Sequence, residues 1–132
     1  MAERFNLTIV TPEREFFNED ADMVEFNTTE GEIGIYQGHA PLTVIVKPGV
    51  LKITQGDTVK YAALHSGFVQ ILADKITILA EIIEWSEEID RKRAEAARDR
   101  AEGRLKSGDA NIDVVRAEAA LMRSIARINA LK

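Results

Sequence analysis

The chain has 132 residues, a formal net charge of −5 and no cysteine, which excludes a disulfide scaffold and a thiolate metal cluster. Its 45% hydrophobic and 30% charged residues are typical of a folded globular protein, and no apolar run reaches the roughly 18 to 20 residues needed to cross a bilayer. The acidic balance argues against a nucleic-acid partner, because non-specific binding of nucleic acid depends on neutralising many phosphates.

The first 84 residues predict a β-domain. They begin without a basic leader followed by an apolar stretch, so we expect a chain that stays in the cytoplasm and does not insert directly into a membrane. Hydrophobic residues alternate with polar ones in four segments, and three more segments are short apolar runs. These segments are 5–9, 24–26, 51–53, 59–63, 42–46, 68–72 and 76–83. Short strands separated by turns, with no helical segment between them, favour an antiparallel β-sandwich or barrel over a parallel sheet.

The amino-acid composition of the chain changes at Trp85. All eight aromatic residues and all three prolines lie at or before it. Residues 1–84 carry 6 basic and 13 acidic side chains, a net charge of −7, whereas residues 85–132 carry 11 and 9, a net charge of +2. We therefore predict two domains, a β-sandwich over 1–84 and a second domain over 85–132.

The second domain predicts two helices. Ser86 is the expected N-cap of the first, because acidic residues follow it and favour the positive end of a helix dipole. The first helix should run to Leu105 and end before Gly108, which suits a C-terminal cap. Asp109 or Asn111 is the expected cap of the second helix.

The second helix should extend over residues 112–131, where the chain has neither proline nor glycine. The connection is so short that the helices should be antiparallel neighbours. The predicted fold is therefore α+β, an N-terminal antiparallel β-sandwich followed by a C-terminal antiparallel α-helical hairpin. The hairpin is rich in alanine, which buries little apolar area, so we expect it to lean on the sandwich, on another subunit, or on each in turn.

A run of glycine-rich sequence in the β-domain carries a family resemblance. Residues 30–42 read EGEIGIYQGHAPL and are followed by PGVL at 48–51 and SGFV at 66–69. Together with the hairpin at the carboxyl end, these segments resemble the epsilon subunit of F-type ATP synthases over the whole chain. Tyr36-Gln37 departs from the apolar residue and proline expected there, which affects a local turn.

The resemblance implies a non-catalytic rotor subunit of the central stalk, peripheral to the cytoplasmic face of the cell membrane. It implies that the sandwich contacts the gamma subunit and the c-ring of the membrane sector and helps to couple proton translocation to catalysis. It also implies that the hairpin inhibits ATP hydrolysis when it extends along gamma toward the alpha and beta subunits. ATP would favour the folded hairpin.

The sharpest motif lies at the start of the hairpin. Ile89-Asp90-x-x-Arg93-Ala94 is similar to the I/L-D-x-x-R-A motif with which some bacterial epsilon subunits bind ATP without hydrolysing it. The resemblance implies that Glu84 belongs to the adenine side of the pocket, that Asp90 and Arg93 make polar contacts, and that Ile89 and Ala94 form the wall. ATP would be a regulatory ligand and not a catalytic cofactor.

Arginines could complete the site. Asp90 and Arg93 are i, i+3 neighbours on a helix, so the carboxylate could orient the guanidinium, whose planar fork suits phosphate oxygens. Arg100 on the first helix, with Arg123 and Arg127 on the second, could add a basic cradle if the helices are antiparallel. The same Asp-x-x-Arg spacing is also a common ion pair worth only about 0.2 to 0.5 kcal/mol, which needs no ligand.

No catalytic or metal site is predicted. The Walker pattern is absent, and no lysine follows any glycine, so the usual phosphate loop is missing. His39 could be read as a base or metal ligand, but the other histidine, His65, falls in an unrelated strand, and a hydrogen-bonded loop histidine is the better interpretation. Two alternatives stay open: a free-standing binding module or small enzyme using His39, and an assembly-only subunit with a structural hairpin.

Overall fold

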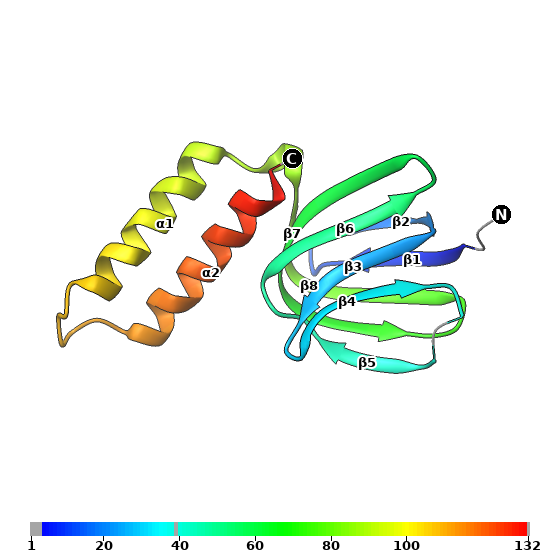
Figure 1. Cartoon of the computed structure of the whole chain (residues 1–132), viewed down its shortest axis with the longest axis horizontal. Coiled ribbons are helices and arrows are strands. Elements are labelled where there is room, and N and C mark those ends of the chain that lie inside the picture. Colours follow the sequence, from blue (N-terminus) through cyan, green and yellow to red (C-terminus); the bar gives the residue numbers. More distant parts are fainter. Residues whose placement is uncertain (1–3, 39, 132) are drawn as a thin grey trace.

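The computed structural model describes residues 4–38 and 40–131 and shows a β-domain joined to two antiparallel helices (Figure 1). The described residues form eight strands, a short 3-10 turn and two α-helices. The strands are β1 (Phe5–Val10), β2 (Glu15–Ala21), β3 (Met23–Thr28), β4 (Gly31–Tyr36), β5 (Leu42–Ile45), β6 (Gly49–Gln55), β7 (Thr58–Ile71) and β8 (Lys75–Trp85). The turn is η1 (Ser86–Glu88), and the helices are α1 (Arg91–Lys106) and α2 (Val114–Ala130). The α+β class predicted from the sequence is confirmed.

The strands follow the order β2-β1-β8-β7-β6-β3-β4, and β5 pairs with β7. The long strand β7 pairs with β6 through its first half and with β5 through its second half. One pair departs from the antiparallel expectation, because β1 runs parallel to β8. β1 and β8 are the first and last strands of the described chain, and the six other described strands lie between them in sequence. A parallel pair needs a long connection, and these strands provide it without a crossover helix.

The alternation of hydrophobic residues predicted from the sequence places them in the core. Phe5, Leu7 and Ile9 of β1 are each at most 1% exposed, and the residues between them are half-buried. The same pattern holds in β3 and β6, where alternate side chains are buried. The core therefore lies within the β-domain, and the helices are attached outside it.

The first helix starts later than predicted. Ser86 does not cap it, because residues 86–88 form the 3-10 turn η1 and the next two residues are extended. Asp90 is the N-cap instead, and its Oδ1 accepts a hydrogen bond from the backbone N–H of Arg93 at 3.1 Å. The turn is fixed by Glu88, which accepts a hydrogen bond from the backbone N–H of Trp85 at 2.9 Å. That local bond diverts the segment from an α-helical start.

The second helix is capped by Asp113 and not by Asp109 or Asn111. Oδ1 of Asp113 accepts a hydrogen bond from the backbone N–H of Arg116 at 3.1 Å. Asp109 instead accepts from the backbone N–H of Asn111 at 2.8 Å, so both residues belong to the connection. Gly108 adopts a φ of 69°, the left-handed conformation expected of the residue that follows a helix C-cap.

The hairpin rests on the sandwich through α2, which contacts β6 and β7, while α1 packs against α2 (Figure 1). The buried residues of both helices are small. They are Ala94 and Ala101 of α1 and Ala117, Ser124, Ala126 and Ala130 of α2. The hairpin therefore leans on the sandwich with little apolar area of its own, one of the arrangements expected from its composition. Among the described residues, no helix is long and apolar enough to span a bilayer.

Candidate functional site

A cavity of about 340 Å³ lies where the end of β8, the turn η1 and the two helices meet. The residues that line it come from both domains and include three carboxylates and three arginines. They are Glu84, Glu88, Ile89, Asp90, Arg93, Ala94, Ala97, Arg100 and Arg127. This volume falls at the lower end of the range for small-molecule pockets. The mixed charge suits a ligand that has both anionic and hydrogen-bonding groups.

Seven of the eight residues predicted from the sequence line this cavity. The eighth, Arg123, is not among the described residues that line it. Arg123 is half-buried on α2, one helical turn before Arg127. The prediction missed Glu88 and Ala97, which line the cavity as well. The spacing of Ala97 could have found it, because it lies one turn after Arg93 on the same face of α1.

Glu84 is the most strongly perturbed group of the site. Its Oε1 accepts hydrogen bonds from Nε2 of His65 at 3.0 Å and from Nε of Arg127 at 2.7 Å. The bond from His65, followed by that from Arg127, outweighs burial and lowers the pKa of Glu84 to about 2. Glu84 is therefore ionised at neutral pH and can only accept hydrogen bonds.

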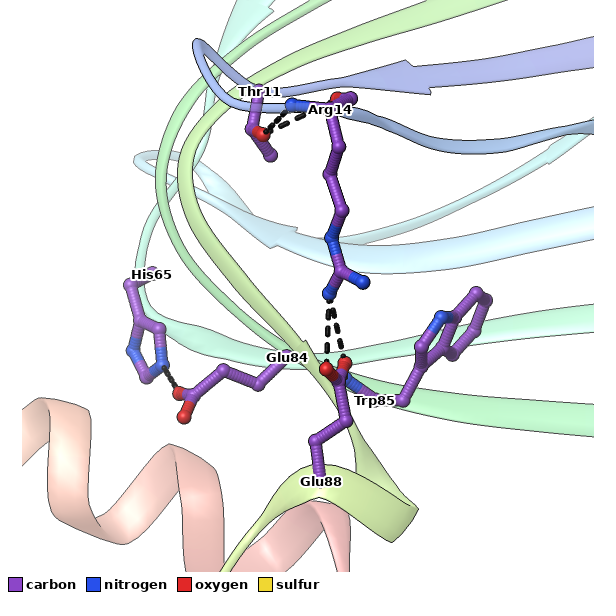
Figure 2. Close-up of polar contacts among 6 residues, drawn as sticks. All are labelled: Thr11, Arg14, His65, Glu84, Trp85 and Glu88. Atoms are coloured by element: carbon purple, nitrogen blue, oxygen red, sulfur yellow. Dashed lines mark hydrogen bonds and ion pairs between the residues drawn. The ribbon is translucent and has the colours of Figure 1, made fainter.

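His65 belongs to this site although the sequence analysis assigned it to an unrelated strand. The hairpin turn after β7 pairs that strand with β8 and sets Ala63 opposite Glu84. His65 lies at a register irregularity between Leu64 and Ser66, and its ring contacts the carboxylate of Glu84 (Figure 2). Counting outward from the Ala73-Asp74-Lys75 turn, where Ile71 pairs with Ile76, would have placed residue 65 opposite residue 82, on the same face of β8 as Glu84. That count was the signal available in the sequence.

Glu88 ties the start of the hairpin to the sandwich. Nη2 of Arg14 donates to both carboxylate oxygens of Glu88, each at 3.0 Å (Figure 2). The backbone N–H of Arg14 is held in turn by Oγ1 of Thr11 at 3.1 Å. Next to this ion pair, the ring of Trp85 stacks on Phe16 with their centroids 4.3 Å apart. Trp85 and Glu88 therefore attach the start of the hairpin to the sandwich.

The Asp90 carboxylate does not orient the guanidinium of Arg93. It caps α1 through the backbone of Arg93, so the ion pair considered from the sequence is not formed. Within residues 4–38 and 40–131, the guanidinium groups of Arg93 and Arg100 make no hydrogen bond or ion pair. Two cations thus face the cavity without a partner, beside a helix N-terminus that also favours anions.

The arrangement supports binding more readily than catalysis. The lining contains carboxylates, arginines and apolar side chains, and none of the described lining residues is a serine, threonine, cysteine, histidine or lysine that could serve as a conventional nucleophile. Of the carboxylates, Glu84 and Glu88 form ion pairs and Asp90 caps a helix. His39, on which the enzyme alternative depends, lies outside the described residues.

Comparisons with known proteins are consistent over both domains. The family model described as ATP synthase, Delta/Epsilon chain, beta-sandwich domain matches residues 4–86. The model described as ATP synthase, Delta/Epsilon chain, long alpha-helix domain matches residues 87–132. The ATP synthase epsilon chain of Desulfitobacterium hafniense strain Y51 is 45% identical over 132 residues, which cover 100% of this chain and 99% of the relative. The epsilon chain of Desulforamulus reducens is 43% identical over 130 residues, covering 98% of each.

Two solved structures share the fold. A chain in the Euglena gracilis mitochondrial ATP synthase matches with a TM-score of 0.86 at 23% identity, covering 98% of this chain and 82% of that one. A chain in the central stalk and c-ring structure of the Tetrahymena thermophila mitochondrial ATP synthase matches with a TM-score of 0.60 at 18% identity, covering 98% and 95%. At these identities the likeness concerns the fold alone.

Proposed function

This chain belongs to the delta/epsilon-chain family of ATP synthases and is a non-catalytic subunit of that complex, and on this premise we propose how it works. In the proposed role it turns with the central stalk of a proton-translocating F-type enzyme. Its sandwich binds the gamma subunit and the c-ring, and its hairpin reaches the alpha and beta subunits when extended. The complex would hold it at the cytoplasmic face of the cell membrane, without insertion.

The proposed ligand of the hairpin is ATP, bound as a regulator in the cavity beside η1. The observation that carries this proposal is that seven of the eight residues predicted for the nucleotide site, including all four of the motif, line one cavity. Arg93 and Arg100 have unpaired guanidinium groups, which suit phosphate oxygens. Glu84 offers an acceptor for the base, and Ile89 provides an apolar wall. In this arrangement Arg123 would join only if the phosphate chain extended along α2.

Binding of ATP would stabilise the docked hairpin. A ligand shifts such an equilibrium only if it binds one state more tightly, and the cavity has walls from both domains only while α2 lies on the sandwich. At a free concentration of about 100 times the dissociation constant, binding to one state contributes about 2.7 kcal/mol. The small buried residues of the hairpin make its docking weak, and an effect of this size would reverse a modest preference for the extended state.

Calorimetric titration of the full chain with ATP tests the binding proposal. Arg93→Ala should weaken ATP binding at least about tenfold, because a charge-assisted hydrogen bond to phosphate contributes about 1.5 to 3 kcal/mol. Arg116→Ala is the matched control, because Arg116 follows the N-cap of α2 just as Arg93 follows that of α1, yet it does not line the cavity. Absence of binding by the wild type at millimolar ATP, or equal losses in the two variants, would reject the proposal.

Inhibition of hydrolysis is tested in the assembled complex by deleting residues 89–132. This deletion removes both helices and keeps the ion pair between Arg14 and Glu88, so the end of β8 stays attached to the sandwich. The truncated subunit should still assemble, and the complex should hydrolyse ATP faster than one that contains the full chain. An unchanged rate would leave only the assembly role of the alternative interpretation.

A further inference from the structure

We propose that His65 is a positioning residue that fixes the carboxylate of Glu84 and thereby makes the cavity selective for an adenine base over a guanine base. No part of the nucleotide motif includes His65, which lies on β7, away from the helices that carry that motif. The inference rests on the proposed function, because it concerns how the same cavity distinguishes its nucleotide.

The direction of the hydrogen bond between His65 and Glu84 follows from the charge of the carboxylate. The lowered pKa of Glu84 keeps it ionised, so it accepts, and the proton must be on Nε2 of His65. The other ring nitrogen, Nδ1, is buried and has no hydrogen-bond partner among the described residues. His65 is only 2% exposed, so leaving that atom unpaired is unfavourable. An apolar side chain at this position would avoid the cost of the unpaired Nδ1, but it could not donate a hydrogen bond to Glu84 as the imidazole does.

This bond determines which oxygen of Glu84 is left for a ligand. Both His65 and Arg127 donate to Oε1, and neither bond involves Oε2. Glu84 lines the cavity, so it offers one open acceptor there and not two. His65 and Glu84 lie on neighbouring strands of the sandwich, whereas Arg127 lies on α2. His65 is therefore the partner that stays in place if the arginine turns toward a phosphate.

A single open acceptor discriminates between the two purines. The exposed edge of adenine carries one exocyclic amino group, which can donate to Oε2. Guanine has a carbonyl oxygen at that position, which would repel the carboxylate, and it carries two adjacent N–H donors farther along its edge. A carboxylate with both oxygens free could grip those two donors in a bidentate pair. By occupying Oε1 and holding the side chain still, His65 disfavours that alternative.

Calorimetry with ATP and GTP on the full chain tests the proposal. The wild type should bind ATP at least about tenfold more tightly than GTP, and His65→Leu should reduce this ratio to below about threefold, through tighter GTP binding and weaker ATP binding. His65→Gln should keep the preference, because its amide can still donate to Glu84. Ser124→Ala is the control, because it removes a buried hydroxyl that donates to the backbone carbonyl of Leu121 and does not line the cavity.

A double substitution separates positioning from packing. In a Glu84→Ala background, His65→Leu should change the ATP to GTP ratio no further, because no acceptor is left to position. A further change in that background would overturn the proposal, as would a His65→Leu variant that loses affinity for both nucleotides equally. If circular dichroism shows that His65→Leu is unfolded, loss of selectivity in a folded His65→Gln variant would overturn it. Failure of the wild type to bind either nucleotide would overturn both this inference and the proposed function, whereas retained selectivity in folded His65→Leu would overturn the inference alone.

Discussion

Replacing Glu84 by glutamine should flatten the acid end of the stability profile. Hydrogen bonds from His65 and then Arg127 lower the pKa of Glu84 from 4.5 to about 2. A carboxyl group whose pKa is lower in the folded state contributes stability above its unfolded pKa and loses it as the pH falls through the folded value. The contribution of Glu84 should therefore be complete at neutral pH and disappear between about pH 4.5 and pH 2.

The size of the effect follows from the same pKa. A fall from 4.5 to about 2 corresponds to at most about 3 kcal/mol, because each tenfold change in proton affinity is worth 1.36 kcal/mol. The Glu84 side chain is 30% exposed, so water screens part of this interaction. We expect about 1 to 2 kcal/mol, which is a large share of the stability of a small domain.

Urea unfolding at several pH values between 7 and 2.5 measures the difference between the wild type and Glu84→Gln. The gap in the free energy of unfolding should be largest at pH 7 and close as the pH falls. The backbone N–H of Gly56 also lowers the pKa of Asp22, which therefore contributes to acid sensitivity as well. Because Asp22 is present in both proteins, its contribution cancels in the difference between them. Glu81→Gln is the control, because this exposed glutamate lies on the same strand. Parallel profiles for the wild type and Glu84→Gln would refute the reasoning.

Three further substitutions test how the two domains are built. Gly67 has a φ of 140°, and a Cβ there would overlap the carbonyl oxygen of Leu79, so Gly67→Ala should lower the free energy of urea unfolding by at least about 2 kcal/mol; an unchanged midpoint would contradict the close packing of β7 on β8. Asp113→Ala should remove the N-cap of α2, lowering stability by about 1 kcal/mol and reducing the helical circular dichroism signal, whereas an unchanged signal would argue against the cap. Arg14→Ala should lower stability by no more than about 1 kcal/mol, because its ion pair with Glu88 is about half exposed, and a larger loss would mean that Arg14 also stabilises the fold through its position over the ring of Phe16.

Local patterns in the sequence predicted six of the eight described strands, because side-chain alternation and burial have the same cause. They missed β2 and β4, whose burial does not alternate regularly, and they divided the long strand β7 into two segments. Phe5, Leu7 and Ile9 alternate along the chain since one face of β1 is in the core. The parallel pairing of β1 with β8 could not be read this way, because it joins residues about 70 positions apart. Helix starts failed for a related reason. Ser86 is a good capping residue, but the contacts of Glu88 with Arg14 and the backbone of Trp85 form a 3-10 turn there.

The Asp-x-x-Arg spacing shows what a short motif can and cannot predict. It occurs at Asp90 and Arg93 and again at Asp113 and Arg116, and both aspartates cap a helix through the backbone of the arginine. The Asp-x-x-Arg spacing therefore predicts a helix start at each of the two sequences, but it does not show which of them binds a ligand. The family resemblance singled out the first, and the fold places only that one beside Glu84.

The remaining errors at the site concern residues distant in sequence. Arg123 and Arg127 share a helical face, but only Arg127 reaches Glu84. Which arginine does so depends on where α2 lies along the sandwich. His65 was missed because its contact with Glu84 depends on the pairing of β7 with β8, which joins segments on opposite sides of a turn. Local periodicity encodes neither contact. The position of Arg127 requires the assembled fold, and the position of His65 requires the strand pairing that is counted outward from the turn.

The cavity is lined by residues of both the sandwich and the hairpin, which explains why a bound ligand would stabilise the docked hairpin. Glu84 belongs to the sandwich and Arg127 to α2, and the 2.7 Å contact between them exists only while the helix is docked. Arg93 and Arg100 add unpaired cations from α1, whose own attachment to the sandwich is through α2 and the turn at η1. An anion held between these arginines, with its other end at Glu84, would bridge the same junction that undocking must break. Its affinity for an undocked chain must then be lower, and that difference is what a regulatory ligand requires.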